Sequence, residues 1–187
     1  QLDYPLAAPS ANITTKVSAV KAKDVKEEFG NKIKYILDGG TCAIGIESTI
    51  VNLIGKPTIL RLGSLDIYKI QKTLGGKVNI NTNSKINIAP GQSHLHYSPG
   101  IPLEMNVTET NNEVAFILIK KRKKPLSNYY YLTTDGNLTT AAKNLYSCLR
   151  EIKKKKYKSI AVEKIPNKGI GITINDRLNR ASKFKIK

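Results

Sequence analysis

Two short polar stretches near the start of the chain carry side chains suited to holding a small polar ligand. The first, residues 5–12, places the hydroxyl of Ser10 and the amide of Asn12 among small residues and two prolines, a composition typical of a tight turn. The second changes from small and polar to apolar at Ser48 and Thr49, as expected where a strand begins. Hydroxyls bind carboxylate or amine groups and an amide donates to phosphate, so these residues indicate ligand binding.

A third candidate is Arg61, in the segment Ile59-Leu60-Arg61-Leu62-Gly63. Its guanidinium is a planar, two-pronged donor that matches the geometry of a phosphate. Each candidate also has a purely structural interpretation. Ser10 and Asn12 would then stabilise their turn. Ser48 would lie at a strand edge, and Arg61 would form a surface ion pair.

The histidines and cysteines do not indicate nucleophilic or metal chemistry. Neither of the two histidines lies in a triad-like setting, and Cys42 and Cys148 occur in unrelated contexts without the spacing of metal ligands. We expect both cysteines to be buried thiols of a protein in a reducing cytosol. The sequence therefore predicts neither a catalytic nucleophile nor a metal site.

The hydrophobic pattern places these side chains on a small set of elements in the first half of the chain. A helix is predicted over residues 19–29, with Ser18 as its N-cap and Gly30 after its end. The other predicted elements are a strand at 33–37, a hairpin of strands 48–54 and 58–62, a helix at 65–74 and a strand at 78–80.

The second half has a different pattern. Residues 81–105 are rich in Asn, Pro and Ser and are predicted to form a linker. Apolar runs at 114–119, 129–132 and 160–162 are typical of strands buried on both faces. Helices are predicted over 138–152 and around Ile174, Leu178 and Ala181. This order predicts a small, Rossmann-like open α/β sheet without a G-x-G-x-x-G fingerprint.

The chain is strongly basic, with a formal net charge of +17. Residues 120–124 and 153–156 are runs of Lys and Arg at the predicted ends of a strand and a helix. Such a field attracts the phosphates of RNA, ATP or a membrane surface. The same runs are also typical of solvated element ends in a lysine-rich composition, so both interpretations stay open. No run of about 18 apolar residues occurs, and no membrane span is predicted.

Further signatures occur in the second half of the chain. They are Ala89-Pro90-Gly91 through His96-Tyr97-Ser98-Pro99, and Gly169-Ile170-Gly171 through Asp176-Arg177-Leu178. In order with the earlier stretches, they resemble the long form of the threonylcarbamoyl-AMP synthase family. This resemblance covers essentially the whole chain. It implies the C-terminal half of a YrdC-like catalytic domain, a twisted mixed sheet with helices, over residues 1–80, then the linker 81–105 and a Rossmann-like C-terminal domain over 106–187.

The resemblance implies a reaction that joins L-threonine, bicarbonate and ATP to give threonylcarbamoyl-AMP and pyrophosphate, for tRNA modification in the cytoplasm. The carbamate of the substrate is the nucleophile in this reaction. The protein therefore has to position the substrates, neutralise charge and exclude water. Mg²⁺ is expected to travel with the ATP phosphates.

The resemblance also implies roles for single residues. Ser10 and Ser48 would hold threonine. Asn12 and Arg61 would contact the nucleotide, and Tyr97, in a linker that lies across the cleft, would contact it as part of a lid. Further candidates for the same site are Ser18, Thr49 and His96.

Other features separate this chain from the family pattern. Val20 stands where the family has a threonine hydroxyl. The segment that the family carries before Pro5, with Lys and Arg residues for the nucleotide, is absent. We therefore expect an N-terminally truncated synthase that is inactive alone and needs the missing half as a partner. Two alternatives stay open: a YrdC-like regulatory protein that binds tRNA or double-stranded RNA, and an inert remnant of a split gene.

Overall fold

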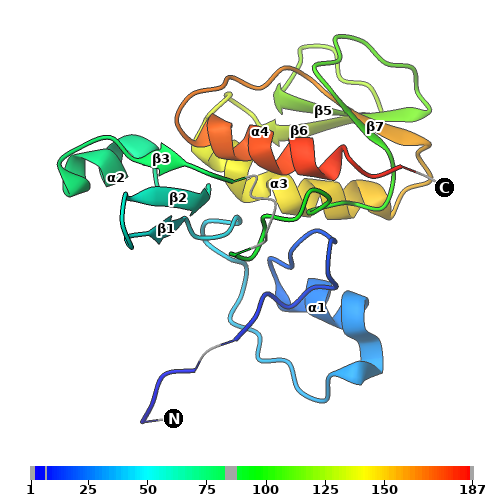
Figure 1. Ribbon diagram of the computed structural model, residues 1–187. Coiled ribbons are helices and arrows are strands. Elements are labelled where there is room, and N and C mark those ends of the chain that lie inside the picture. Colours follow the sequence, from blue (N-terminus) through cyan, green and yellow to red (C-terminus); the bar gives the residue numbers. More distant parts are fainter. Residues whose placement is uncertain (1–2, 7, 83–87, 186–187) are drawn as a thin grey trace.

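The chain is built around two separate β-sheets, one in each half of the sequence (Figure 1). A computed structural model describes residues 3–6, 8–82 and 88–185, so residue 7 of the first polar stretch and residues 83–87 of the linker lie outside the described residues. The helices are α1 (Ala22–Phe29), α2 (Ile67–Leu74), α3 (Leu138–Lys153), α4 (Ile170–Ala181) and the short 3₁₀ helix η1 (Gly30–Lys32). The strands are β1 (Ile50–Asn52), β2 (Thr58–Arg61), β3 (Asn79–Ile80), β4 (Leu103–Met105), β5 (Val114–Lys120), β6 (Tyr129–Thr133) and β7 (Ser159–Val162).

The first sheet has three short strands in the order β1-β2-β3. β1 and β2 pair antiparallel, with Ile50 opposite Arg61, which confirms the predicted hairpin. β3 runs parallel to β2 after the crossover helix α2. Asp66 caps the N-terminus of α2, because its side chain accepts a hydrogen bond from the amide N–H of Tyr68. The sheet is therefore mixed, and its core is small: Ile59, Leu62, Ile70 and Val78.

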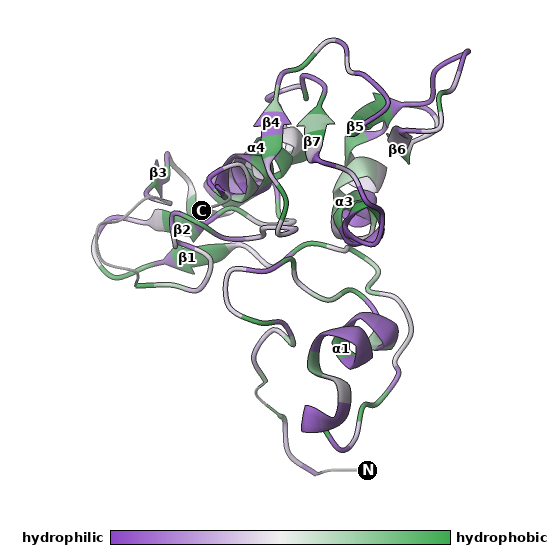
Figure 2. Ribbon diagram, turned by 90° about the vertical axis from the view of Figure 1, so that its right-hand side faces the viewer, coloured by the Kyte–Doolittle hydropathy of each residue, from purple (hydrophilic) through white to green (hydrophobic). Residues whose placement is uncertain are grey.

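The second sheet is entirely parallel, in the order β4-β7-β5-β6. Helices α3 and α4 pack on one of its faces (Figures 1 and 2). The other face buries Phe116, Leu118 and Ala161. Burial on both faces explains why the strands read as continuous apolar runs, and the predicted open α/β sheet is confirmed. We call residues 103–183 the C-terminal unit and residues 8–82 the N-terminal region.

Helix α3 forms where the sequence combines a cap with an apolar stripe. The side chain of Asn137 accepts a hydrogen bond from the amide N–H of Thr140 at 3.0 Å, which satisfies a free donor of the first turn. The stripe then packs against the sheet, and its members Ala141, Leu145, Leu149 and Ile152 are buried. Each large side chain on it contributes about 1.5–3 kcal/mol by leaving water.

The structure corrects several predictions in the N-terminal region. Residues 33–37 form no strand, and Leu37 is 97% exposed. α1 begins at Ala22 and not at residue 19, because Ser18 is buried and donates its hydroxyl to Glu47 instead of capping a helix. Cys42 is exposed, whereas Cys148 is buried as expected.

The structure also adds a strand within the predicted linker. Leu103 to Met105 form β4, an edge strand, and Leu103 pairs with Ile160 of β7. The three residues are too few to give a periodic signal in the sequence, and they are extended because β7 offers a free edge. The linker therefore ends as part of the second sheet.

α1 and the segments around it lie apart from both sheets and contact α3 (Figure 1). A buried ion pair joins Glu28 to Arg150 of α3 at 3.0 Å. Several apolar side chains of the N-terminal region are exposed: Tyr35, Leu37 and Ile44 in the segments after α1, and Leu53 and Ile54 in the hairpin turn after β1. None of the helices that the structure describes has the length and apolar character that crossing a bilayer requires.

Candidate functional site

Arg61 and Ser48 meet at one end of the first sheet. Arg61 ends β2, and Ser48 precedes the paired strand β1. The Arg61 Nε donates to the backbone carbonyl of Ser48 at 3.0 Å, and one terminal nitrogen donates to the Ser48 hydroxyl at 3.1 Å. The other terminal nitrogen donates to the carbonyl of Pro90 in the linker at 3.4 Å. Ser48 is exposed and Arg61 partly exposed, so both remain accessible to a ligand.

Tyr97 reaches the same place from the linker. Its φ of 59° is unusual for a residue with a side chain, and such backbone costs about 1–3 kcal/mol unless the surroundings hold it. Its ring is held between Tyr146, stacked at 5.7 Å, and the guanidinium of Arg177, 4.6 Å from the ring centroid. Its hydroxyl is buried and has no hydrogen-bond partner among the described residues. Burial raises the pKa of Tyr97 to about 12, so this hydroxyl stays protonated.

Gly91 explains how the linker brings Tyr97 close to Arg61. A Cβ at Gly91 would lie 2.5 Å from the Tyr97 hydroxyl and 3.0 Å from Cδ of Arg61. Only glycine fits this approach, and its φ of +89° also favours glycine. The structure therefore brings Ser48, Arg61 and Tyr97 together around one short piece of linker backbone.

His96 adds an imidazole beside this group. Its Nδ1 accepts a hydrogen bond from the amide N–H of Tyr97 at 3.0 Å, and its ring centroid lies 4.0 Å from that of Tyr97. Burial lowers the pKa of His96, and the guanidiniums of Arg177, Arg180 and Arg61 lower it further against an opposing effect of Glu47. The imidazole is therefore neutral at physiological pH.

Thr49 and Ser18 have structural partners. The Thr49 hydroxyl exchanges hydrogen bonds with the backbone of Leu65 at 3.3 Å, which ties the start of β1 to the start of α2. Ser18 donates to Glu47 Oε1 at 2.7 Å. Ser18 thereby contacts the residue that precedes Ser48, whereas Thr49 faces α2.

Ser10 and Asn12 lie in a turn of their own. The amide N–H of Asn12 donates to the Ser10 carbonyl at 2.9 Å, and the Asn12 side chain donates to the carbonyls of Ile13 and Lys16. Among the described residues, no hydrogen bond joins Ser10 or Asn12 to Ser48, Arg61 or Tyr97. The segment after this turn meets the linker where the Ser98 amide donates to the Thr15 carbonyl at 2.8 Å and Lys16 forms a parallel bridge with Ser98.

Sequence reasoning missed two charged residues behind the site, Glu47 and Arg177. Glu47 Oε2 accepts from Arg177 Nε at 3.1 Å and from the Tyr146 hydroxyl at 2.8 Å. Burial raises the pKa of Glu47, but Arg177 and the hydrogen bonds from Ser18 and Tyr146 outweigh burial and hold that pKa below its usual value. Arg177 lies in the stretch Asp176-Arg177-Leu178, which is one of the sequence signatures, but no role was predicted for this arginine.

The described residues offer no resident metal site. They contain no group of three or more His, Cys, Asp or Glu side chains arranged to hold a metal ion. The Glu47 carboxylate is already occupied by Arg177, Tyr146 and Ser18.

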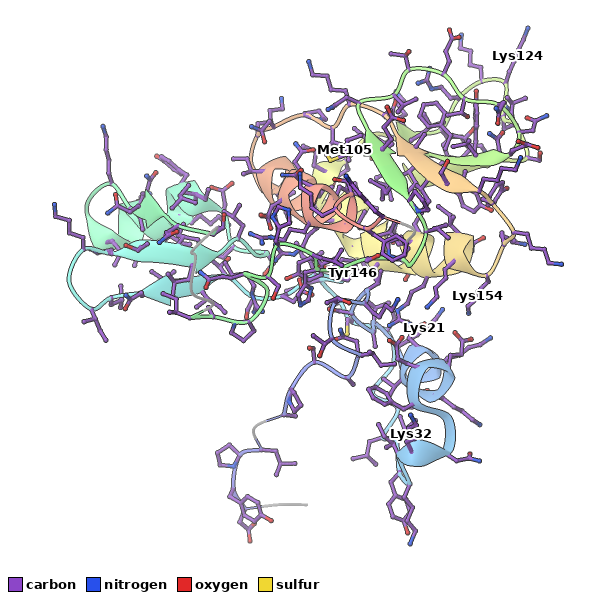
Figure 3. The ribbon with its side chains drawn as sticks, turned by 45° about the vertical axis from the view of Figure 1, so that its right-hand side comes forward. Lys21, Lys32, Met105, Lys124, Tyr146 and Lys154 are labelled. Atoms are coloured by element: carbon purple, nitrogen blue, oxygen red, sulfur yellow. The ribbon has the colours of Figure 1, made fainter. Side chains whose placement is uncertain are left out.

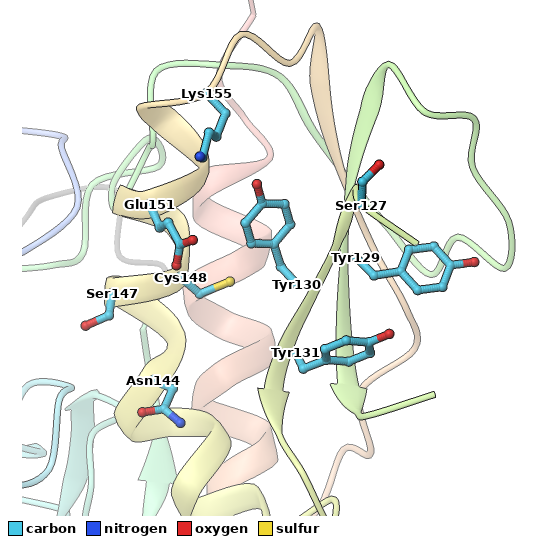
Figure 4. Close-up of a pocket in the computed structure, with 9 residues that line it drawn as sticks. All are labelled: Ser127, Tyr129, Tyr130, Tyr131, Asn144, Ser147, Cys148, Glu151 and Lys155. Carbon is cyan, nitrogen blue, oxygen red and sulfur yellow. The ribbon is translucent and has the colours of Figure 1, made fainter. Parts of the chain in front are cut away.

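A hollow lies on the C-terminal unit, between β6 and α3 (Figure 4). Its volume is about 560 Å³, and its lining includes Tyr130, Cys148 and Lys155. Burial raises the pKa of the Cys148 thiol to about 12, which makes it a poor nucleophile. This hollow contains none of the residues predicted to bind a ligand.

Two protein-family models match consecutive parts of the chain. Residues 64–183 match the model described as "Threonylcarbamoyl-AMP synthase, C-terminal domain". Residues 1–63 match the model described as "Telomere recombination". The first match alone covers more than half of the sequence.

Curated relatives carry the same name as the first model. The threonylcarbamoyl-AMP synthase of Pyrococcus abyssi is 30% identical over 205 residues, which cover 98% of this chain and 59% of that protein. The threonylcarbamoyl-AMP synthase of Schizosaccharomyces pombe is 32% identical over 216 residues, which cover 96% of this chain and 52% of that protein. The chain thus spans about half the length of the curated relatives it matches.

Solved structures show the same likeness. P. abyssi Sua5 complexed with L-threonine superimposes with a TM-score of 0.80 at 29% identity, over 93% of this chain and 56% of that chain. A variant of that protein, in which an adjacent histidine and tyrosine are both alanine, gives a TM-score of 0.78 at 28% identity, over 93% of this chain and 56% of that chain.

Proposed function

The chain belongs to the threonylcarbamoyl-AMP synthase family, and from this premise we propose that it supplies part of a site where such a synthase binds ATP and L-threonine. The observation that carries the proposal is the convergence of Ser48, Arg61 and Tyr97. The hydroxyl of Ser48 and the guanidinium of Arg61 lie 3.1 Å apart, and a Cβ at Gly91 would meet both the buried hydroxyl of Tyr97 and Cδ of Arg61.

The three side chains fit the two substrates by their chemistry. Arg61 would donate to phosphate oxygens of ATP, since its guanidinium is partly exposed and permanently charged. Ser48 would contact the threonine. Tyr97 would donate its unpartnered hydroxyl to the nucleotide. One finding on a relative supports a threonine site: P. abyssi Sua5 was solved complexed with L-threonine. A variant of that protein changes an adjacent histidine and tyrosine, and His96-Tyr97 is the one adjacent His-Tyr pair in this sequence.

The proposed reaction places few chemical demands on the protein. The amine of threonine combines with bicarbonate to give a carbamate and water. A carboxylate oxygen of the carbamate then attacks the α-phosphorus of ATP, and the bond to the bridging oxygen breaks as pyrophosphate leaves. Arg61 would neutralise negative charge on the phosphate, and the linker would exclude water from the mixed anhydride. Mg²⁺ would be held by the phosphates, because the described residues supply no cage for it.

Further polypeptide would complete the site in a synthase of the relatives' length. The N-terminal region leaves Leu37 exposed in the segment after α1, and Leu53 and Ile54 exposed in the turn after β1. Exposed apolar groups of this kind are typical of a surface that other residues cover. We therefore propose that Ser10 and Asn12 join the site only when this cover is present, and that tRNA modification and a cytoplasmic location are properties of the whole synthase.

Calorimetric titration of the chain with ATP and with L-threonine tests the proposal. We expect Arg61→Ala to weaken ATP binding at least tenfold, because a charge-assisted contact contributes about 1.5–3 kcal/mol. Ser48→Ala should weaken threonine binding and leave ATP binding within twofold. Lys158→Ala is the control, since its ammonium forms an exposed ion pair with Glu113 outside the site and outside both lysine runs.

The same titrations can contradict the proposal. If the unmodified chain binds ATP and Arg61→Ala binds it equally well, the nucleotide lies elsewhere. Product formation is then measured from ATP, bicarbonate and threonine by chromatography, with and without the remaining part of a synthase. We expect threonylcarbamoyl-AMP at ordinary rates only with that part present.

The lysine runs favour a second candidate function, binding of tRNA or double-stranded RNA. Residues 120–124 and 153–156 are exposed, and Lys124 and Lys154 project from the surface of the C-terminal unit (Figure 3). Contacts to phosphate release counterions, so affinity for a fluorescent tRNA should fall steeply between 50 and 200 mM salt and saturate at one chain per RNA. Non-saturating binding would indicate charge alone.

A further inference from the structure

Arg177, in the middle of α4, is almost completely buried. Its exposed fraction is 1%, and a charged group at that depth requires a full set of partners. Its Nε donates to Glu47 at 3.1 Å, one terminal nitrogen donates to Asp176, and the other donates to the carbonyl of Leu62. The face of the guanidinium lies 4.6 Å from the ring centroid of Tyr97.

These contacts reach all three pieces of the candidate site. Glu47 immediately precedes Ser48, and Leu62 immediately follows Arg61. Tyr97 is itself a member of the site. One side chain of the C-terminal unit therefore touches the start of β1, the end of β2 and the linker at once.

Glu47 extends the same contact to two further elements. Its carboxylate accepts from Ser18 in the N-terminal region and from Tyr146 on α3. Tyr146 is 1% exposed and stacks on Tyr97 from the side of α3. Arg177, Glu47 and Tyr146 therefore form one buried polar network behind the site.

Two other buried arginines, Arg150 and Arg180, also join the C-terminal unit to the rest of the chain, mainly through backbone carbonyls. Arg150 donates to the carbonyls of Val17 and Ser18 and pairs with Glu28. Arg180 donates to the carbonyls of Gln92, Ser93 and Thr82. Arg180 also pairs with Asp176, which Arg177 contacts as well. Arg177 differs from both in that its own side chain contacts Glu47, Leu62 and Tyr97.

We infer that Arg177 is a positioning residue, which sets the relative placement of Ser48, Arg61 and Tyr97 and so makes the C-terminal unit a part of the ligand site. This inference rests on the proposed function for its effect on ligands. The structural part of the inference is that the segments carrying Ser48, Arg61 and Tyr97 all depend on Arg177 for their placement. This part can be tested without any ligand.

Hydrogen exchange of backbone amides tests the structural part. The variant Arg177→Lys keeps the positive charge but loses the planar guanidinium with its several N–H donors. In this variant we expect faster exchange at residues 61–64 and at residues 96–98 together. The strands β5 and β7 should keep their protection. Arg150→Lys is the matched control, and its faster exchange should be confined to residues around Val17 and Ser18. If residues 61–64 and 96–98 exchange as in the unmodified chain, Arg177 positions nothing there and the inference is overturned.

A double variant guards against simple unfolding. Removing Arg177 alone leaves the Glu47 charge buried and unpaired, whereas Glu47→Gln with Arg177→Met removes both charges at once. The double variant should fold and still show fast exchange at both segments. Slow exchange at both segments in a folded double variant would also overturn the inference.

Ligand affinity tests the functional part. We expect Arg177→Lys to weaken ATP binding about tenfold while Lys158→Arg, at an exposed pair with Glu113 outside both lysine runs, stays within twofold, with both variants folded by circular dichroism. Unchanged ATP affinity beside faster exchange would overturn the link between Arg177 and the ligand. If the unmodified chain binds neither ATP nor threonine, the proposed function fails. The exchange experiment then still decides whether Arg177 positions the segments around Ser48, Arg61 and Tyr97.

Discussion

The N-terminal region and the C-terminal unit are stabilised in different ways. The C-terminal unit closes its own core: Ile117, Leu132, Leu145, Ile160 and Leu178 are all fully buried between the sheet and its two helices. The three-stranded sheet of the N-terminal region buries only four apolar residues in its cluster. It compensates with polar contacts, because Arg150, Arg177 and Arg180 donate to its backbone or to that of the linker.

This difference shows where the geometry of the candidate site originates. Ser48 and Arg61 lie at the end of the small first sheet, whereas Tyr97 is buried in the core cluster of the C-terminal unit against Tyr146. Their positions depend on side chains from α3 and α4. A ligand site can therefore lie in one half of a chain and be held in shape by the other half.

The largest effect is expected from breaking the buried ion pair between the halves. Arg177→Met leaves the Glu47 carboxylate without its charged partner, which costs about 3–5 kcal/mol of unfolding free energy. Urea denaturation followed by circular dichroism measures this loss. Arg122→Met removes an exposed pair and should cost less than about 1 kcal/mol. Equal losses in the two variants would mean that the halves are held together by other contacts.

A cavity in the C-terminal unit should come next. Leu145→Ala removes a fully buried side chain between α3 and the sheet, at an expected cost of about 2–5 kcal/mol. Leu53→Ala, at a 63% exposed position near β1, should change stability by less than about 0.5 kcal/mol. A comparable cost at Leu53 would show that the N-terminal region buries it in solution.

The sequence predicted the C-terminal unit well because its signals are long and locally consistent. The apolar runs of β5, β6 and β7 and the stripe of α3 each specify one structure over several residues. In the N-terminal region, residues 33–37 have the composition of a strand but no strand among the described residues to pair with. Pairing partners far along the chain are not visible in a local pattern.

The candidate site was predictable only in part for a similar reason. Ser48, Arg61 and Tyr97 could be named because their residue types suit the ligand chemistry. Glu47 and Arg177 are separated by 130 residues, and a buried ion pair between such distant positions leaves no periodic trace. Ser10 and Asn12 suit the same chemistry, but the structure gives them a separate turn.

Acid should weaken the contact between the halves through Glu47. The folded pKa of Glu47 is lowered relative to its ordinary value, despite burial, by Arg177 and by hydrogen bonds from Ser18 and Tyr146. The stabilisation is thus fully present above the ordinary pKa of about 4.3 and is lost as pH falls through the lowered folded pKa. Urea denaturation between pH 7 and pH 3 should show this loss, and Glu47→Gln should show a smaller one. Identical pH profiles would assign the acid sensitivity to other carboxylates.

A smaller effect is expected in the linker. Gly91→Ala places a methyl group 2.5 Å from the Tyr97 hydroxyl in a backbone that disfavours side chains, at a cost of about 1–3 kcal/mol and with weaker ATP binding. Gly55→Ala is the control, since its φ is also positive but no atom lies within 4 Å of the added Cβ. Weaker ATP binding in both variants would point to backbone strain and not to the approach of Tyr97.

The smallest effect is expected at an exposed contact between the same two regions. Lys154 pairs with Glu27 of α1 at 2.8 Å, with half of its side chain exposed. Lys154→Ala should change the unfolding free energy by less than about 0.5 kcal/mol, as thermal denaturation can show. If Lys154→Ala lowered the unfolding free energy as much as Arg177→Met, buried and exposed ion pairs between the two regions would contribute equally.

The central claim is that Ser48, Arg61 and Tyr97 form one ligand site. Nuclear magnetic resonance of the ¹⁵N-labelled chain during titration with ATP and L-threonine tests it most directly. The account predicts that the Arg61 Nε resonance and the amides of Ser48 and Tyr97 shift together, with one dissociation constant. Shifts confined to residues 120–124 and 153–156, with those three resonances unchanged, would contradict it.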